Sequence, residues 1–415
     1  MPAVGYAAPN EACAIKVRIL FIHEVNYLNK VVFEMHEFPE LLALRGHDVT
    51  FFHYPEEPDD RVISMRSASR KISGRVHPEA QIRLVTPPTF GGHASERYIA
   101  PILSLASLRK EIVHGKYDVI VLYAVPTTGW QAVAFARRAG IPIVYRALDV
   151  SHQIRSNPLS SLIHRAERYV AKNSSMVSGN NPAMTSYCVR MSHRIGPAVT
   201  NLPPIDLAHF TAADASQIRP ELGLTSSDKV LLYMGTFFEF SGLDILIDEL
   251  EPYFSSHPDL KLVLIGGGEL DSVLRDTVKS RGLQHQVIFT GVIPYAKLPG
   301  YLKSADVAVN PFRKELLTDV ALPHKVLQYM AAGVPAVSTN LDGLRGVLGE
   351  DSGVTLVDGP QHVAQAAVQI AYSPDHDREE IGRRQRDYVD RTFSHKLAVD
   401  DFEKTLTSLA NSNRL

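Results

Sequence analysis

The chain has 415 residues, of which 45% are hydrophobic and 21% are charged, and its formal net charge is −2. This length predicts two domains of about 200 residues each, because one typical core would not hold it. The near-neutral charge gives no indication of nucleic acid as a partner. Cys13 and Cys188 are too few for a disulfide framework. No apolar run reaches the roughly 18 residues of a membrane span, and residues 1–14 lack the pattern of a secretory signal. We therefore expect a cytoplasmic protein with an N-terminal tail over residues 1–14.

The first half of the chain alternates strands and helices. Strands are predicted at Val17–Val25 and Asp48–Tyr54, separated by a helix that ends at Gly46. A basic segment without acidic residues follows and contains Arg61, Arg66, Arg70, Lys71 and Arg75. Its simpler interpretation is a solvated loop. The alternative is a basic lip that meets an anionic lipid head group or a phosphorylated acceptor, at the inner face of a membrane in the lipid case.

Two polar residues follow neighbouring predicted strands in this half. Tyr123 ends the strand that begins near Asp118, and Asp149 ends the next one. Polar side chains at the carboxyl ends of parallel strands lie where α/β folds bind ligands. For Tyr123, a hydrogen-bonded place in the core is nearly as good an interpretation. A helix with a basic face is predicted from Ser160 to Lys172, and the proline-rich residues 201–206 indicate a linker between domains.

The second half contains the most informative stretch, LPHKVLQYMAAGVPAVST from Leu322 to Thr339. It follows an apolar strand and predicts a helix that starts after Pro323 and ends at Gly333. The free N–H groups and positive dipole end of such a helix favour a phosphate, and Lys325 adds a full charge. From these residues alone, an ordinary crossover helix with a solvated lysine is an equally good interpretation. A triple glycine at 266–268 is by itself a weak signal.

This stretch resembles the donor-binding helix of the retaining family 4 glycosyltransferases, in the subgroup that reads roughly LPxKxxEYMAAGxPVV. Other segments are similar over nearly the whole chain. The resemblance implies an α/β protein of the GT-B fold, in which two Rossmann-like domains face a central cleft. The acceptor-side domain would span residues 15–205 and the nucleotide-sugar-binding domain residues 206–390. The last helix, within 391–415, would cross back to the first domain.

The resemblance also implies roles for individual residues. The nucleobase would lie near Gly291, the ribose on Gln328, and the diphosphate near Gly235 and Lys325. The catalytic residues implied are Lys325, Asp149 and Tyr123, and Asn26 and Tyr27 would lie on the acceptor side. The donor-binding residues implied are Gly235, Thr236, Ser241, Gly267, Gly291, Val292, Ile293, Asp319, Leu322, Lys325 and Gln328.

The chain departs from the family pattern at four places. The loop at residues 26–30 has no glycine, Tyr123 replaces a histidine, Gln328 replaces a glutamate, and Thr236 and Ser241 replace an arginine and a lysine. The first hypothesis is a retaining, metal-independent glycosyltransferase with no cofactor. It would use a nucleotide diphosphate sugar, with UDP favoured, and a sugar, lipid-linked or small-molecule acceptor. The second is a catalytically silent GT-B protein that serves as a nucleotide-binding or partner subunit. The histidines show no metal-ligand spacing.

Overall fold

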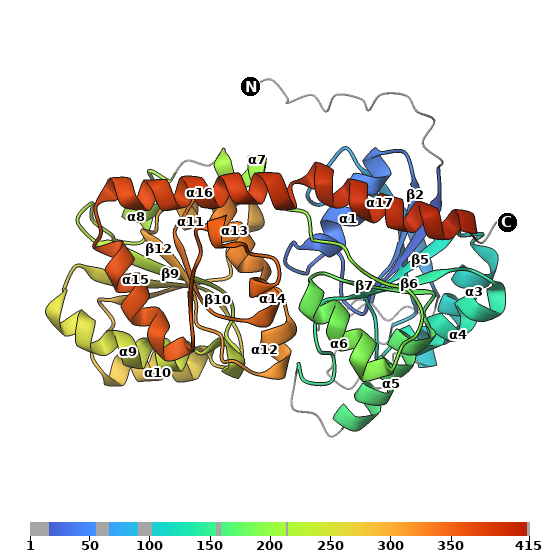
Figure 1. Ribbon diagram of the computed structural model, residues 1–415, viewed down its shortest axis with the longest axis horizontal. Helices are drawn as coiled ribbons and strands as arrows, with labels where there is room; N and C mark the ends of the chain where they lie inside the picture. The colour runs from blue at the N-terminus through green and yellow to red at the C-terminus, as the bar shows by residue number, and fades with distance from the viewer. Residues whose placement is uncertain (1–15, 55–65, 90–101, 155–158, 213–214, 413–415) are drawn as a thin grey trace.

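The computed structural model describes residues 16–54, 66–89, 102–154, 159–212 and 215–412. It has two α/β lobes, each built around its own sheet (Figure 1). The two-domain α/β architecture predicted above is therefore confirmed. The predicted tail at residues 1–14 and Arg61 lie outside the described residues.

The first lobe contains an eight-stranded sheet in the order β3-β4-β2-β1-β5-β6-β7-β8, counted over the described residues. Only β3, at the edge, runs antiparallel to its neighbour. A strand such as β5, with the sequence VIVL, is buried on both faces, as expected where helices cover both sides of a parallel sheet. The strands are β1 Arg18–Ile22, β2 Asp48–Phe52, β3 Ala68–Ser73, β4 Gln81–Thr86, β5 Val119–Leu122, β6 Ile143–Ala147, β7 Met176–Gly179 and β8 Ala198–Thr200.

Alternate residues of these strands face two helical layers. Ile19 and Phe21 of β1 pack with α1 (Glu34–Leu44) and the C-terminal helix α17 (His395–Ser412). Leu20 and Ile22 pack on the opposite side. That side is covered by α3 (Leu105–His114), α4 (Gly129–Ala139), α5 (Ser160–Asn173) and α6 (Pro182–Ser192).

The second lobe has a parallel sheet of six strands in the order β11-β10-β9-β12-β13-β14 within the described chain, around one continuous core. The strands are β9 Lys229–Thr236, β10 Leu260–Gly267, β11 Val287–Gly291, β12 Val307–Asn310, β13 Ala336–Thr339 and β14 Thr355–Val357. The helices are α7 Leu207–Thr211, α8 Ile218–Glu221, α9 Leu243–Ser256, α10 Asp271–Ser280, α11 Leu298–Lys303, α12 Leu316–Val320, α13 His324–Ala332, α14 Asp342–Arg345, α15 Val363–Ala371 and α16 Asp375–Phe393.

The chain connects the lobes at two points that lie beside each other. The backbone N–H of Ile205 donates to the carbonyl of Phe393 over 2.8 Å. Helix α16 lies along the second lobe and α17 along the first (Figure 1). On α17, the ring of Phe402 packs against that of Phe38, with 4.4 Å between centroids. The exact domain boundaries at residues 205 and 390 remain predictions.

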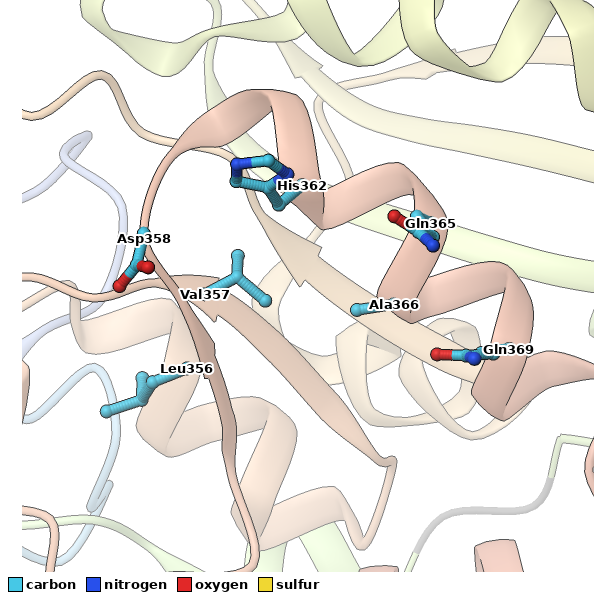
Figure 2. Close-up of a pocket in the computed structure, with 7 residues that line it drawn as sticks. All are labelled: Leu356, Val357, Asp358, His362, Gln365, Ala366 and Gln369. Atoms are coloured by element: carbon cyan, nitrogen blue, oxygen red, sulfur yellow. The ribbon is translucent and has the colours of Figure 1, made fainter.

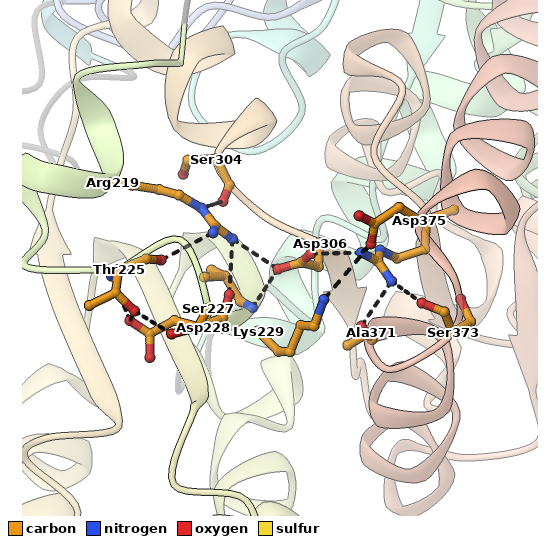
Figure 3. Close-up of polar contacts among 12 residues, drawn as sticks. Arg219, Thr225, Ser227, Asp228, Lys229, Ser304, Asp306, Ala371, Ser373 and Asp375 are labelled. Carbon is orange, nitrogen blue, oxygen red and sulfur yellow. Dashed lines mark hydrogen bonds and ion pairs between the residues drawn. The ribbon is translucent and has the colours of Figure 1, made fainter.

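An ionic network holds the amino ends of β9 and β12 (Figure 3). The carboxylate of Asp306 lies 3.0 Å from Arg219 and 3.4 Å from Arg378, and it accepts the backbone N–H of Val230 over 2.8 Å. Arg219 belongs to α8 and Arg378 to α16, so one carboxylate ties two helices to the sheet. Because the network lies at the amino ends of the strands, the opposite, carboxyl ends are available for ligand binding.

Candidate active site

Three neighbouring strands of the second sheet, called here the glycine-ended strands, have glycine as their last or next-to-last residue. These are Gly235 on β9, Gly267 on β10 and Gly291 on β11. Gly235 and Gly291 have φ values of +144° and +72°, which side chains rarely adopt. A Cβ at Gly267 or Gly291 would meet nothing within 4 Å. The strand ends therefore present backbone, with open space in front of two of the three.

Lys325 reaches this edge from the first turn of α13. Pro323 is the N-cap of the helix, and Gly333 ends it at φ +72°. The Nζ of Lys325 donates to the hydroxyl of Tyr233 over 2.8 Å. A Cβ on Gly235 would lie only 2.7 Å from that Nζ. The absence of a side chain at position 235 is what lets the ammonium group lie against the end of β9.

The charge of Lys325 is only partly compensated. Its Nζ lies 4.0 Å from the ring centroid of Tyr233 and 4.3 Å from that of Phe312, so two aromatic faces stabilise the cation. It makes no ion pair within the part of the chain that the structure describes. Burial lowers the pKa of Lys325 well below its ordinary value. An anion bound at this place would favour the protonated form of Lys325.

The other predicted residues near α13 differ in how open they are. Gln328, one turn after Lys325, is only 7% exposed, and Leu322 belongs to the core of the second lobe. Asp319 accepts the backbone N–H of Asp342 over 3.0 Å, so it holds the start of α14. Its carboxylate is thereby occupied with a structural bond.

The turn after β9 and the loop after β11 each contain one exposed and one buried or partly buried residue of the predicted site. Thr236 is exposed, whereas Ser241 is fully buried and donates to the carbonyl of Phe238 over 2.5 Å. The Ser241 hydroxyl also interacts with the side chain of Tyr233, the tyrosine that accepts the hydrogen bond of Lys325. Val292 is exposed, and Ile293 packs partly against the core.

The first lobe contributes a buried ion pair between α1 and β6. Nε and Nη2 of Arg146 each lie 2.7 Å from a carboxylate oxygen of Glu34. Nη1 of Arg146 also donates to the carbonyl of Asn201 over 2.7 Å. Both side chains are almost fully buried. Sequence analysis missed this pair, although acidic residues within the apolar helix EMHEFPELL were a signal.

Tyr123 and Asp149 lie at adjacent strand ends but in different surroundings. The Tyr123 hydroxyl donates to Glu34 over 3.2 Å, and its ring stacks on His23 with 5.2 Å between centroids. Burial lowers the pKa of His23 to about 3, so this ring is neutral. Asp149 is exposed at its strand end. Desolvation by the surrounding protein, and then the charge of Glu34, nevertheless raises the pKa of its carboxyl to about 6.

The side chains of the two residues predicted for the acceptor side form hydrogen bonds within the protein. The side-chain oxygen of Asn26 accepts the N–H of Leu28 over 3.0 Å, which closes the turn that lacks glycine. Tyr27 is fully buried, and its hydroxyl donates to Glu40 over 2.5 Å. The prediction for the Tyr27 side chain does not match this placement, because the tyrosine ring completes the core instead.

His324 lies beside the candidate site, and sequence analysis did not single it out. It precedes Lys325, and neither ring nitrogen has a hydrogen-bond partner among the described residues. Burial lowers its pKa, while Glu37 and Glu34 of the first lobe raise it. The start of α13 therefore lies close to the first lobe. Asn181 adds a direct link, since its side chain donates to the carbonyl of Val320 over 3.0 Å.

A pocket of about 430 Å³ lies elsewhere on the second lobe, along β14 and α15 (Figure 2). Its polar lining comes from Asp358, His362, Gln365 and Gln369. None of the predicted site residues borders it. The glycine-ended strands and Lys325, rather than this pocket, form the candidate active site.

Comparisons with known proteins indicate the class of protein. The family profile "Glycosyl transferases group 1" matches residues 228–372, and "Glycosyl transferase 4-like domain" matches residues 35–201. The chain is 24% identical over 294 residues to a D-inositol 3-phosphate glycosyltransferase of Arthrobacter, with 68% of each chain covered. A protein of the same description from Thermobispora bispora is 24% identical over 341 residues, covering 75% of this chain and 77% of the relative.

Solved structures give the same architecture. Anabaena HepE in complex with UDP and glucose superposes with a TM-score of 0.72 at 16% identity, covering 94% of this chain and all of HepE. Sucrose-phosphate synthase of Thermosynechococcus elongatus superposes with a TM-score of 0.74 at 18% identity, covering 96% and 100% of the two chains. At these identities the likeness concerns the fold.

Two parallel-sheet lobes and a glycine-lined edge beside a helix N-terminus define a protein of the GT-B fold. The chain is a glycosyltransferase of the GT-B fold, with a match to the group 1 profile in its second lobe and to the 4-like profile in its first.

Proposed function

We propose that this glycosyltransferase moves a sugar from a nucleotide diphosphate sugar to an acceptor hydroxyl, with retention of configuration and without a metal ion. The observation that carries the proposal is the position of Lys325. Its Nζ lies at the glycine end of β9, at the N-terminus of α13, with no ion pair among the described residues. A helix N-terminus and an ammonium group at one backbone edge suit a diphosphate.

The donor would extend along the three glycine-ended strands. We place the diphosphate at Gly235, Thr236 and Lys325, the ribose near Gln328, and the base beside Gly291 and the loop after it. Open space in front of Gly267 and Gly291 supports this path. UDP is the favoured nucleotide, and the solved complex of HepE with UDP and glucose supports that choice.

The chemistry would depend on stabilising the leaving group. Negative charge develops on the diphosphate as the sugar departs, and Lys325 with the α13 N–H groups would stabilise it. The departing phosphate would accept the proton of the acceptor hydroxyl. Asp149 is the charged residue that would contact the sugar from the first lobe. Tyr123 would act as a positioning residue, because its hydroxyl is held by Glu34.

The acceptor is proposed only by class. The names of two relatives, D-inositol 3-phosphate glycosyltransferase and alpha-monoglucosyldiacylglycerol synthase of Acholeplasma laidlawii, support a hydroxylated small molecule or a lipid-linked acceptor. The second of these is 22% identical over 213 residues. These matches to glycosyltransferases do not favour the alternative of a silent subunit.

A ligand screen followed by turnover tests the proposal. Thermal shift in the presence of EDTA should show stabilisation by UDP, of about 2.7 kcal/mol at a hundredfold excess over Kd. NMR of the product formed from a UDP-sugar should show the anomeric configuration of the donor. No stabilisation by UDP, GDP or ADP would contradict the proposal and favour the silent protein. An inverted product would overturn retention alone.

A further inference from the structure

The outer faces of α3, α4 and α5 form a continuous surface of the first lobe, on the side away from α1 and α17. Figure 1 shows the three helices next to one another, and α4 contacts both neighbours. Their two acidic residues are not on this surface. Glu111 binds Arg83 and Tyr117, and Glu167 is fully buried, where it binds His152.

This surface, called here the α3–α5 surface, is strongly basic although the whole chain has a net charge of −2. Its basic residues are all exposed, and none forms an ion pair with another described residue. They are Arg109 and Lys110 on α3, Arg137 and Arg138 on α4, and Arg165, Arg168 and Lys172 on α5.

Several basic residues on helices of the second lobe form ion pairs instead. Arg281 is paired with Asp248, Arg383 with Glu380, and Arg391 with Asp351. These three arginines differ in this respect from the seven exposed basic residues of the α3–α5 surface, which have no ion pair among the described residues.

Large apolar side chains are exposed on the same three helices. Leu162 on α5 is 60% exposed, and Leu105, Val113 and Trp130 are also exposed. A groove of about 560 Å³ runs between α3 and α4, where Leu105 and Val113 lie near Phe135. Single exposed apolar residues are common, but several on one surface indicate a binding site.

The basic segment noted in the sequence adjoins this surface. Ser67, just before β3, is hydrogen-bonded through its hydroxyl to Ser107 of α3. On β3 itself, Arg70 and Lys71 are exposed. Arg75 has another role, because it donates to the carbonyl of Tyr27 over 2.9 Å. The positive area thus extends from β3 across the three helices.

We propose that the α3–α5 surface docks the protein on the surface of an anionic lipid bilayer. Cations attract the anionic head groups, and apolar side chains between them enter the interface below. Nucleic acid or another soluble polyanion would use the cations but leave Leu162 and Trp130 in water. The combination of both residue types on one surface favours lipid.

Vesicle flotation with the full chain tests the proposal. The protein should bind vesicles of phosphatidylcholine with phosphatidylglycerol, bind phosphatidylcholine alone weakly, and dissociate as salt rises. Trp130 is the single tryptophan of the chain, so its fluorescence reports directly on this surface. Its emission should move to shorter wavelength on anionic vesicles.

Two matched triple variants separate a local surface from overall charge. Changing Arg165, Arg168 and Lys172 to Gln should reduce binding by roughly tenfold or more. Changing Arg281, Arg383 and Arg391 to Gln removes the same charge and should leave binding unchanged. Equal loss in both variants, or no binding to anionic vesicles, would overturn the proposal. The proposal would also be overturned if the protein bound heparin as tightly as it binds vesicles and its Trp130 emission did not change on vesicles.

Discussion

The Nζ of Lys325 lies 2.8 Å from the hydroxyl of Tyr233 and 4.0 Å from the centroid of the same ring. One tyrosine thus accepts a hydrogen bond from the ammonium group and offers it an aromatic face. The side chain is held in place before any ligand arrives. A lysine fixed in this way loses little rotational freedom when it binds an anion, and this favours affinity.

Lys325→Ala should weaken the binding of UDP about 10- to 100-fold, which corresponds to roughly 1.5–3 kcal/mol for a charge-assisted hydrogen bond. Isothermal calorimetry measures the change. Lys279→Ala is the control, because Lys279 is exposed on α10 away from the glycine-ended strands. Unchanged affinity in Lys325→Ala would place the diphosphate elsewhere.

The affinity for UDP should fall as pH rises from neutral to alkaline values. Burial lowers the pKa of Lys325 in the free protein, and a bound diphosphate raises it again. The complex therefore holds more proton than the free protein, so binding takes up a proton and weakens as pH rises. Calorimetry in buffers of different ionisation enthalpy should detect this uptake. Lys325→Ala should abolish it, and uptake that persists in the variant would assign it to another group.

Gly235→Ala should weaken UDP binding and destabilise the protein. Its φ of +144° is strained for alanine, and the new Cβ would push the Lys325 ammonium group from its place. The control is Gly223→Ala, where φ is +69° and the Cβ would meet nothing within 4 Å. Denaturant unfolding should show a loss in both variants, while calorimetry should show weaker UDP binding only at position 235. If Gly235→Ala binds UDP as the wild type does, the position of the Lys325 ammonium group does not depend on the absence of a side chain at position 235.

Substitutions of Gln328 test its predicted contact with the ribose. Gln328→Ala should weaken UDP binding, because the amide that bonds the diol is lost. Gln328→Glu should preserve or strengthen binding through a charge-assisted hydrogen bond. Weaker binding of the glutamate variant would mean that another carboxylate already contacts the diol and repels the new one. Equal affinities in all three proteins would remove Gln328 from the site.

Breaking the ion pair between Glu34 and Arg146 should destabilise the first lobe. Glu34→Gln leaves Arg146 buried without its counter-charge and should lower the free energy of unfolding by about 3–5 kcal/mol. Chemical denaturation measures the loss, and the exposed pair of Glu380 and Arg383 supplies the control Glu380→Gln, which should change stability little. A loss of stability no greater than that of Glu380→Gln would show that the buried ion pair does not stabilise the first lobe.

The sequence by itself determined the class of the fold and most of its elements. Buried strands and helix end signals are local, so the helix after Pro323 with its end at Gly333 could be predicted, as could the helix from Ser160. The resemblance around Lys325 led to the GT-B fold, which the comparisons confirm.

The tertiary structure alone decided which polar side chains are free. Ser241, Asp319 and Tyr27 are polar residues at predicted site positions, yet each already has a partner within the protein. Conversely, His324 has no hydrogen-bond partner among the described residues, and nothing in its sequence position indicated this. Partners such as Glu40 for Tyr27, or Arg146 for Glu34, lie far apart in the sequence or on different elements. A hydrogen bond depends on distance and direction in space, and folding sets both.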